Sequence, residues 1–138
     1  MPTFNKLIAV RAVTAFIVLE KDASTWSAVL ESATKFSANL SRQINEVGYE
    51  VQSLRLIANP FGEYLDTSCT QTAVAQLLQL QSELKALEET SGTRIRFSIG
   101  AATTADELSL VPSLIKAAGD LANCCINIPI SEDHLLDY

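Results

Sequence analysis

The sequence is poor in the residue types that usually build catalytic and metal centres. It contains one histidine, one methionine and three cysteines in 138 residues. The histidine, His134, lies in a short acidic tail, residues 131–138, with no second cluster of strong ligands to join it. We therefore expect no metal site and no Ser-His-Asp triad, and a solvated tail is favoured over a metal-binding one.

The three cysteines show no spacing typical of metal binding or redox catalysis. Cys69 stands alone, and Cys124 and Cys125 are adjacent in an apolar stretch without a Cys-x-x-Cys pattern. Reduced thiols in a cytoplasmic protein, two of them buried, are the favoured interpretation. A strained disulfide between Cys124 and Cys125, or a soft metal bound to them, is the alternative.

Long apolar runs and basic clusters are also missing. The most apolar stretch, Leu7 to Leu19, is interrupted by Arg11 and Thr14 and is shorter than the roughly 20 residues of a membrane span. The N-terminal residues lack the pattern of a secretory signal. Ten Lys and Arg stand against sixteen Asp and Glu, a net charge of −6, and form no basic stripe. We expect a cytoplasmic protein that binds neither membranes nor nucleic acid.

A glycine-rich phosphate loop is absent too, because "SIGAAT" at residues 98–103 matches neither GxGxxG nor GxxxxGK. We therefore expect no nucleotide and no other cofactor. What the chain does have is a globular composition, 48% hydrophobic and 19% charged. Its length suits one domain over residues 1–138 with a buried core.

Four apolar, β-branched runs alternate with three helical patterns along the chain. The runs predict strands, and they span residues 9–20, 49–58, 93–103 and 125–130. Pro60 ends the second strand, and Pro129 places the fourth at an edge or ends it early. Strand-helix-strand repeated in this way predicts a βαβαβαβ chain of parallel strands joined by right-handed crossover helices, in the α/β class.

Each helical pattern has an apolar stripe that we expect to face the core. The first helix follows candidate caps at Asp22 and Ser24, and the third follows a capping box at Thr104 and Glu107. Pro112 would be tolerable only in the first turn of that helix. The stripes are Trp26, Val29, Leu30, Ala33, Phe36, Leu40, Ile44 and Val47; Val74, Leu77, Leu78, Leu84 and Leu87; and Leu110, Leu114, Ala118 and Leu121.

Four segments stand out in the order of their residues: "RAVTAFIVLE", "GYEVQSLRLIANPF", "IRFSIGA" and "VPSLIKAAGDLANCCINI". Together they resemble the N-terminal part of an uncharacterised family, catalogued as domain of unknown function seven hundred and eleven. The resemblance covers nearly the whole chain and implies half of a glycyl-radical-enzyme-like α/β barrel, in which two half-barrels of parallel strands are antiparallel to each other. It implies no established reaction. Nothing in this chain resembles the glycine loop of those enzymes, so radical chemistry from this chain alone is not expected.

Half of a barrel leaves one sheet face and at least one strand edge uncovered, and exposed apolar surface of that kind drives association. We therefore expect a homo-oligomer, or a partner polypeptide that completes the barrel. The rival arrangement is an open sandwich whose own helices fold over both sheet faces.

Arginine recurs on the predicted strands, and it suggests a site. Arg is suited to a bidentate grip on carboxylate or phosphate, and ligands of open parallel sheets bind near the ends of the strands. The first strand contributes Arg11 beside Val13, Ala15 and Ile17, and Arg94 aligns with Arg96 on the third strand. The hypothesis is a small-anion site formed by Arg11, Arg55, Asn59, Arg96 and Ser98.

The favoured alternative is structural. Arg55 would pair with a carboxylate such as Glu50, Glu63 or Asp66, its stem packed on apolar surface. Asn59 would then serve to end the strand and tie its loop.

Three functions stay open at this point. The first is an uncharacterised α/β protein that self-associates or pairs with a partner chain and binds a small anionic metabolite. The second is an enzyme subunit whose active site forms only on assembly, with catalytic residues that the sequence does not identify. The third is a purely structural interaction module.

Overall fold

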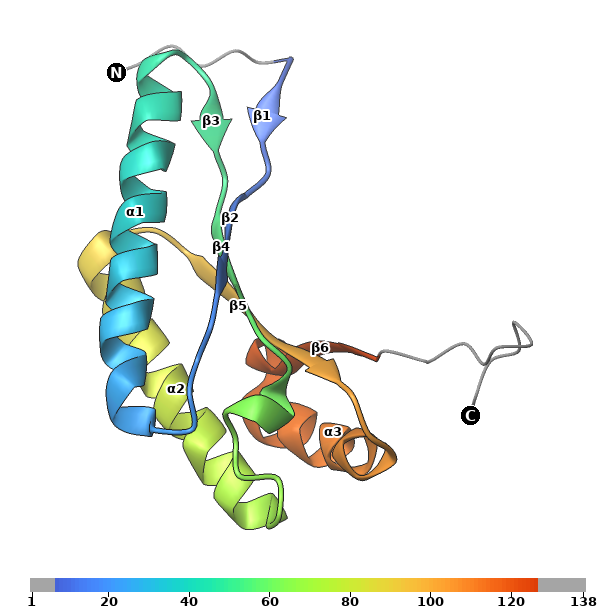
Figure 1. Cartoon of the computed structure of the whole chain (residues 1–138). Helices are drawn as coiled ribbons and strands as arrows, with labels where there is room; N and C mark the ends of the chain where they lie inside the picture. The colour runs from blue at the N-terminus through green and yellow to red at the C-terminus, as the bar shows by residue number, and fades with distance from the viewer. Residues whose placement is uncertain (1–6, 127–138) are drawn as a thin grey trace.

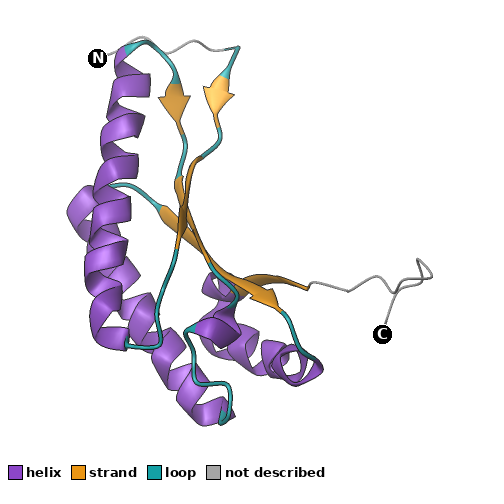
Figure 2. Cartoon of the chain, viewed as in Figure 1, coloured by secondary structure: helices purple, strands orange, loops and turns teal. Residues whose placement is uncertain are grey.

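The apolar runs form parallel strands, as the sequence predicts. The computed structural model describes residues 7–126. In this part of the chain, β2 (Val13–Ile17), β4 (Leu54–Ala58), β5 (Ile95–Ala102) and β6 (Asn123–Ile126) form one sheet in the order β2-β4-β5-β6. Every neighbouring pair in this sheet is parallel. The α/β class with crossover helices is therefore confirmed (Figures 1 and 2).

The first two predicted strands are each broken in two, which the sequence pattern did not indicate. Their first parts, β1 (Ala9–Val10) and β3 (Glu50–Val51), form a separate parallel pair. At the break, the Ser53 hydroxyl donates to the Arg11 carbonyl oxygen at 2.9 Å, in place of a backbone donor. The pair extends beyond the main sheet as an arm beside the end of the first helix (Figure 1).

Three α-helices follow the strands: α1 (Trp26–Glu46), α2 (Thr70–Ser91) and α3 (Ala105–Ala118). Short 3₁₀ turns precede α1 (Ala23–Thr25), follow β4 (Phe61–Glu63) and follow α3 (Gly119–Ala122). The predicted boundaries hold where side chains cap the backbone. The Asp22 carboxylate accepts from the Ser24 N–H at 3.0 Å, and the Thr104 hydroxyl accepts from the Glu107 N–H at 3.1 Å.

Pro112 is an exception to the predicted boundaries. It lies inside α3, not in its first turn. The missing N–H of Pro112 costs the helix a backbone hydrogen bond, but the burial of Leu114 and Ala118 beyond it outweighs this cost. Both residues belong to the predicted apolar stripe. Parts of other predictions lie outside the described residues: positions 127–130 of the fourth strand with Pro129, and the acidic tail with His134.

All three helices lie on one side of the sheet (Figures 1 and 2). The strands follow one another in chain order, and right-handed crossovers between sequential parallel strands place every connecting helix on the same face. The strands alternate accordingly, with Leu54, Leu56 and Ala58 buried against the helices and Arg55 and Ile57 on the uncovered side. The open sandwich with helices over both faces is thus not the arrangement of residues 7–126.

The buried face of α1 differs from its predicted apolar stripe. Phe36 and Val47 are 67% and 71% exposed, and the residues that α1 buries are Trp26, Leu30, Thr34, Ser37 and Ser41. Of the predicted stripe, Trp26 and Leu30 are buried and Val29, Ala33 and Ile44 pack against the core, so the prediction is confirmed for these residues and wrong for Phe36, Leu40 and Val47. In α2, Leu77 and Leu84 are buried as predicted, but Leu78 is 42% exposed.

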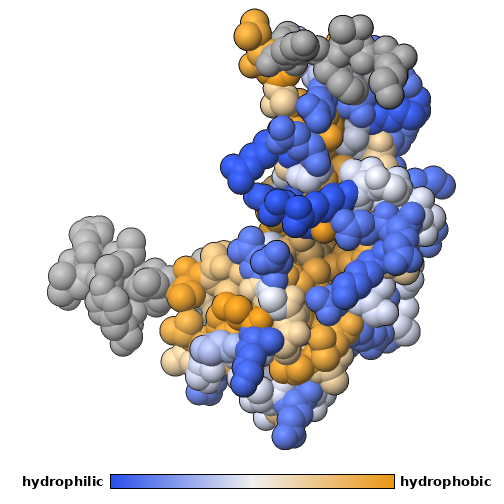
Figure 3. Space-filling view, turned by 180° about the vertical axis from the view of Figure 1, so that it is seen from behind, coloured by the Kyte–Doolittle hydropathy of each residue, from blue (hydrophilic) through white to orange (hydrophobic). Residues whose placement is uncertain are grey.

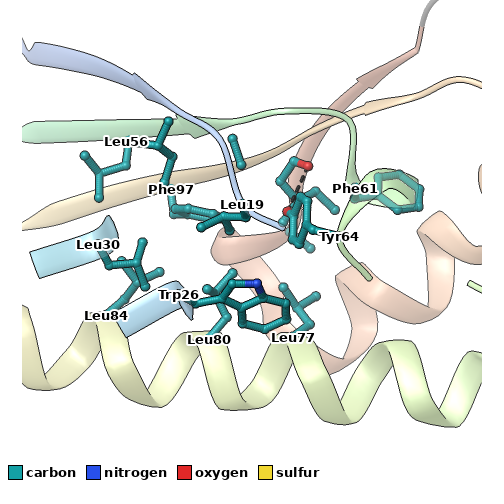
Figure 4. Packing of buried hydrophobic residues seen from close by; sticks show 14 of the residues in the cluster. Leu19, Trp26, Leu30, Leu56, Phe61, Tyr64, Leu77, Leu80, Leu84 and Phe97 are labelled. Atoms are coloured by element: carbon teal, nitrogen blue, oxygen red, sulfur yellow. Dashed lines mark hydrogen bonds between the residues drawn. The ribbon is translucent and has the colours of Figure 1, made fainter. Parts of the chain in front are cut away.

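The core between helices and sheet is built around two aromatic rings (Figure 4). Trp26 and Tyr64 meet edge to face with centroids 5.8 Å apart. The Trp26 indole donates to the Glu20 carbonyl oxygen at 2.7 Å, and the Tyr64 hydroxyl donates to the Ile99 carbonyl oxygen at 3.0 Å. Burial raises the pKa of Tyr64 far above its ordinary value. Both polar tips are satisfied, so the rings fix how α1, the β4–α2 loop and β5 fit together.

Candidate anion site on the open face of the sheet

The strand register places two arginines side by side on the open face. Thr14 of β2 pairs with Arg55 of β4, and Arg55 pairs with Arg96 of β5. Residues in register on neighbouring strands share a face of the sheet. The next row toward the carboxyl ends is Phe16, Ile57 and Ser98. A cationic row therefore borders an apolar one.

These arginines line a hollow of ≈ 100 Å³ on the described surface. Its polar walls come from β5, from the neighbouring strands and from the turn before β6, and they consist of Arg55, Arg94, Arg96, Ser98, Asp120 and Asn123. Ile95, Phe97 and Leu121 complete the lining. Seen from behind (Figure 3), long hydrophilic side chains cross the narrow middle of the molecule, with hydrophobic surface below them.

Within residues 7–126, the guanidinium groups of Arg55, Arg94 and Arg96 have no hydrogen-bond or ion-pair partner. The ion pair of this part of the chain joins Arg42 and Glu46 on α1. Asp120 lines the hollow but lies beyond ion-pair distance of the arginines. The hollow thus holds three cationic groups and one carboxylate that does not pair with them.

The carboxylates proposed as structural partners of Arg55 are engaged elsewhere or distant. Glu63 accepts from the Asn59 side-chain amide at 2.8 Å. Asp66 accepts from the backbone N–H and the hydroxyl of Ser68, and these bonds lower the pKa of the Asp66 carboxyl. Glu50 lies in β3, outside the main sheet. Structural pairing of Arg55 is therefore not found in the described part of the chain.

Asn59 lies outside the hollow and has a structural role. Its side-chain oxygen accepts from the Leu19 N–H at 2.9 Å, and its amide donates to the Leu19 carbonyl oxygen at 3.1 Å. The sequence suggested that Asn59 ties its own loop, and its amide does donate to Glu63 of that loop at 2.8 Å. Asn59 also ties the chain after β2 to the end of β4. Gly100 of β5 packs directly against this point, since a Cβ there would lie 2.1 Å from the Asn59 carbonyl oxygen.

Arg11 also lies outside the hollow. It is exposed in the break between β1 and β2, whereas Val13 and Ile17, with which the sequence grouped it, point into the core. Arg55, Arg96 and Ser98 are the predicted residues that the structure brings together. The polar lining residues that sequence reasoning left out are Arg94, which was aligned with Arg96 but not chosen, Asp120 and Asn123.

Asn123 belongs to the hollow because β6 begins earlier than predicted. It pairs in register with Ser98, whose hydroxyl donates to the Asn123 carbonyl oxygen at 2.8 Å. The sequence placed the strand start at Cys125, so Asn123 was not considered. Polar residues directly before an apolar run were the signal that could have identified it.

The thiols differ from the prediction that two of them are buried. Cys69 and Cys125 are exposed, Cys124 is half-buried, and all three are free. Hydrogen bonds from Thr72 lower the pKa of Cys69, which stands directly before α2, whereas burial raises the pKa of Cys124.

Two further features of the described residues bear on function. None of the helices there has the length and apolar content that a membrane crossing requires. No group of three or more His, Cys, Asp or Glu side chains in residues 7–126 is arranged to hold a metal ion.

Comparison with known families supplies an identity at the level of family. The family described as "Uncharacterised ACR (DUF711)" matches residues 3–135. The chain belongs to this family, which confirms the resemblance seen in its sequence. No curated protein and no solved structure matches the chain significantly. The family description names no reaction, so function has to be argued from the site.

Proposed function

We propose that this member of the family binds a small anionic metabolite, a carboxylate or a phosphate, in the hollow of Arg55, Arg94 and Arg96. One observation carries the proposal: three guanidinium groups line one hollow, and no carboxylate of the described chain pairs with them. Like charges directly opposite each other on neighbouring strands are destabilising. Arg55 and Arg96 stand in that relation, and an anion between them removes the cost.

The donor geometry suits an oxyanion. Each guanidinium presents a planar fork of N–H donors that matches two oxygens of a carboxylate or phosphate, and such charge-assisted bonds are the strong ones. The Ser98 proton is already used on the Asn123 carbonyl oxygen. We therefore assign Ser98 to holding β6 against β5, and the three arginines to the anion.

Binding is favoured over catalysis by the chemistry of the same lining. Among its lining residues in the described part of the chain, Asp120 is the one side chain suited to act as a base, and no thiol or imidazole is among them. An enzyme subunit would need its nucleophile or acid from a second polypeptide. Binding of an anion needs nothing beyond the groups already gathered.

The test is thermal denaturation and calorimetry with phosphate, citrate and succinate as probes. A ligand that binds the folded state at 100 times its Kd stabilises by about 2.7 kcal/mol, a rise in Tm of several degrees. We expect Arg55→Ala and Arg96→Ala each to weaken binding at least about tenfold, since a hydrogen bond to a charged group contributes about 1.5–3 kcal/mol.

Arg42→Ala is the matched control, because Arg42 lies on α1 and pairs with Glu46 far from the hollow. It should leave probe binding unchanged. The proposal fails if no probe stabilises the wild-type chain, or if Arg96→Ala binds the probes as tightly as Arg42→Ala does.

A second function, assembly with a partner chain, is favoured by a different observation. Phe16 and Val18 are 81% and 69% exposed on or beside the face that no helix covers. Apolar side chains gathered on one sheet face are typical of an interaction surface. A partner that completes a barrel would cover this face and close the arginine hollow from above. Co-purification of a second polypeptide with the protein from its native cell tests this arrangement.

A further inference from the structure

Within residues 7–126, β2 pairs with β4 on one side, and its other edge is unpaired and has little protection against pairing. The Val13 N–H donates to the Ser53 carbonyl oxygen at 3.1 Å, so alternate residues from Val13 bond toward β4. The N–H and C=O groups of Thr14 and Phe16 therefore point away from the sheet. The stretch Val13–Ile17 contains no charge, proline or glycine, the usual devices that keep an edge from pairing.

An exposed apolar stripe runs along α1 on the same side of the molecule. At 100° per residue, Phe36, Leu40 and Val47 fall within one sector of about 40°. Phe36 and Val47 are largely exposed, whereas Thr34 and Ala38 on the opposite flank are covered. Because α2 is the helix that contacts α1, it lies on the covered flank. The stripe therefore faces the side of the free β2 edge.

We infer that a second copy of this chain pairs with this one, β2 edge to β2 edge and antiparallel, with α1 packed on α1. Adjacent strands lie about 4.8 Å apart, and α1 contacts both β2 and β4. Two helices, each centred over its own β2–β4 pair, would then lie about 10 Å apart, which is the usual helix packing distance. Pairing about one two-fold axis would bury both the β2 edge and the apolar stripe of α1, and the same surface of each copy would form the interface, as in an isologous dimer.

Charge selects the antiparallel direction. The charged residues nearest to β2 are Arg11 before it and Glu20 after it, and both are exposed. Antiparallel pairing centred on Ala15 places Arg11 of one copy opposite Leu19 of the other, one residue from Glu20, at both ends, whereas parallel pairing would oppose like charges. On α1, the charged residues lie away from the stripe, at Glu31, Lys35, Arg42 and Glu46. No charge is therefore buried between the helices.

The test begins with sedimentation equilibrium and light scattering at micromolar concentration. The wild-type chain should have twice its 15.0 kDa mass. Phe36→Glu and Thr14→Pro should each raise the dimer Kd at least about tenfold, the first by burying a charge and the second by removing an outward N–H. Leu78→Glu is the control, because Leu78 is an exposed apolar residue on α2, and it should stay dimeric.

Circular dichroism of each variant at high dilution separates lost pairing from lost folding. A wild-type mass of 15.0 kDa at these concentrations overturns the inference. A dimer that persists in both folded variants, or that Leu78→Glu dissociates equally, also overturns it.

Charge reversal tests the direction of pairing. At low salt, Arg11→Glu should weaken the dimer about fivefold by setting two carboxylates together at each end, and adding Glu20→Arg should restore it. A parallel dimer would show no such rescue, and that result overturns the antiparallel arrangement. Arg11 is not part of the arginine hollow, so anion binding by Arg11→Glu reports separately on the proposed function.

Discussion

Gly100 is the residue where the backbone itself leaves no room for a side chain. Its φ is +86°, in the region that L-residues avoid, and a Cβ would lie 2.1 Å from the Asn59 carbonyl oxygen. The contact is with backbone, so no side chain can move aside to relieve it. The position joins β5 to the point where Asn59 ties the chain after β2 to β4.

We expect Gly100→Ala to destabilise the fold by at least about 2 kcal/mol, from the left-handed backbone and the clash together. Urea denaturation measures the difference. Gly92→Ala is the matched control, because Gly92 has a φ of +65° but no atom within 4 Å of an added Cβ. It should cost about 1 kcal/mol from the left-handed backbone alone, and equal losses at the two positions would contradict the role given to the contact.

At the same scale, the sequence identified the arginines but not all of their surroundings. The period-two alternation of a strand fixes that Arg55 and Arg96 share a face with Ile57 and Ser98, so this half of the site could be predicted. Arg11 could not be placed, because the break after β1 changes which residues face the core, and that break depends on a hydrogen bond from Ser53.

At the scale of the element, α1 shows where hydrophobicity alone misleads. Trp26 and Leu30 are buried as predicted, but farther along the helix the buried residues are the small Thr34, Ser37 and Ser41, whereas Phe36 and Val47 are exposed. A search for apolar periodicity selects the face with the largest apolar side chains. The face that packs on the sheet is instead the one whose surface fits the sheet most closely. The boundaries of α1 and α3 were predictable because Asp22 and Thr104 cap locally.

This choice of face leaves two hydroxyls of α1, Thr34 Oγ1 and Ser37 Oγ, buried without a partner in the described residues. We expect Thr34→Val, which keeps the shape and removes the unpaired polar group, to stabilise the protein by about 1 kcal/mol. Chemical denaturation monitored by Trp26 fluorescence measures it. Thr90→Val is the control, since the exposed Thr90 hydroxyl donates to the Ala86 carbonyl oxygen at 2.8 Å, and it should not stabilise.

At the scale of the whole molecule, the parallel order of strands could be predicted from alternation and connection length, and it places the helices on one face. Which surfaces stay open follows from that order. The sequence could not predict that Arg94 and Asn123 line the same hollow. Their proximity depends on where β6 begins and on the pairing of Asn123 with Ser98.

Global unfolding should become easier at high pH because of Tyr64. Its pKa is raised in the folded state by burial, so above the ordinary value of 10.0 the unfolded chain loses this proton first. The unfolded state therefore binds fewer protons, and the free energy of unfolding falls as pH rises from about 10 upward, by up to about 1.4 kcal/mol per pH unit.

We expect Tyr64→Phe to flatten this fall while lowering stability at neutral pH by about 1 kcal/mol, through loss of the bond to the Ile99 carbonyl oxygen. Denaturant titrations between pH 8 and about 11 compare the two chains. Tyr49→Phe, at a partly exposed tyrosine, is the control. A slope for Tyr64→Phe equal to that of the wild-type chain would contradict the assignment.

The sheet order β2-β4-β5-β6 also bears on how the protein is made. Each strand of this sheet pairs with the strand of the same sheet that precedes it in the chain, and none has to be inserted between two strands that already pair. During synthesis the sheet can therefore grow by one strand and its crossover helix at a time. Each new helix can cover its strands soon after it leaves the exit tunnel.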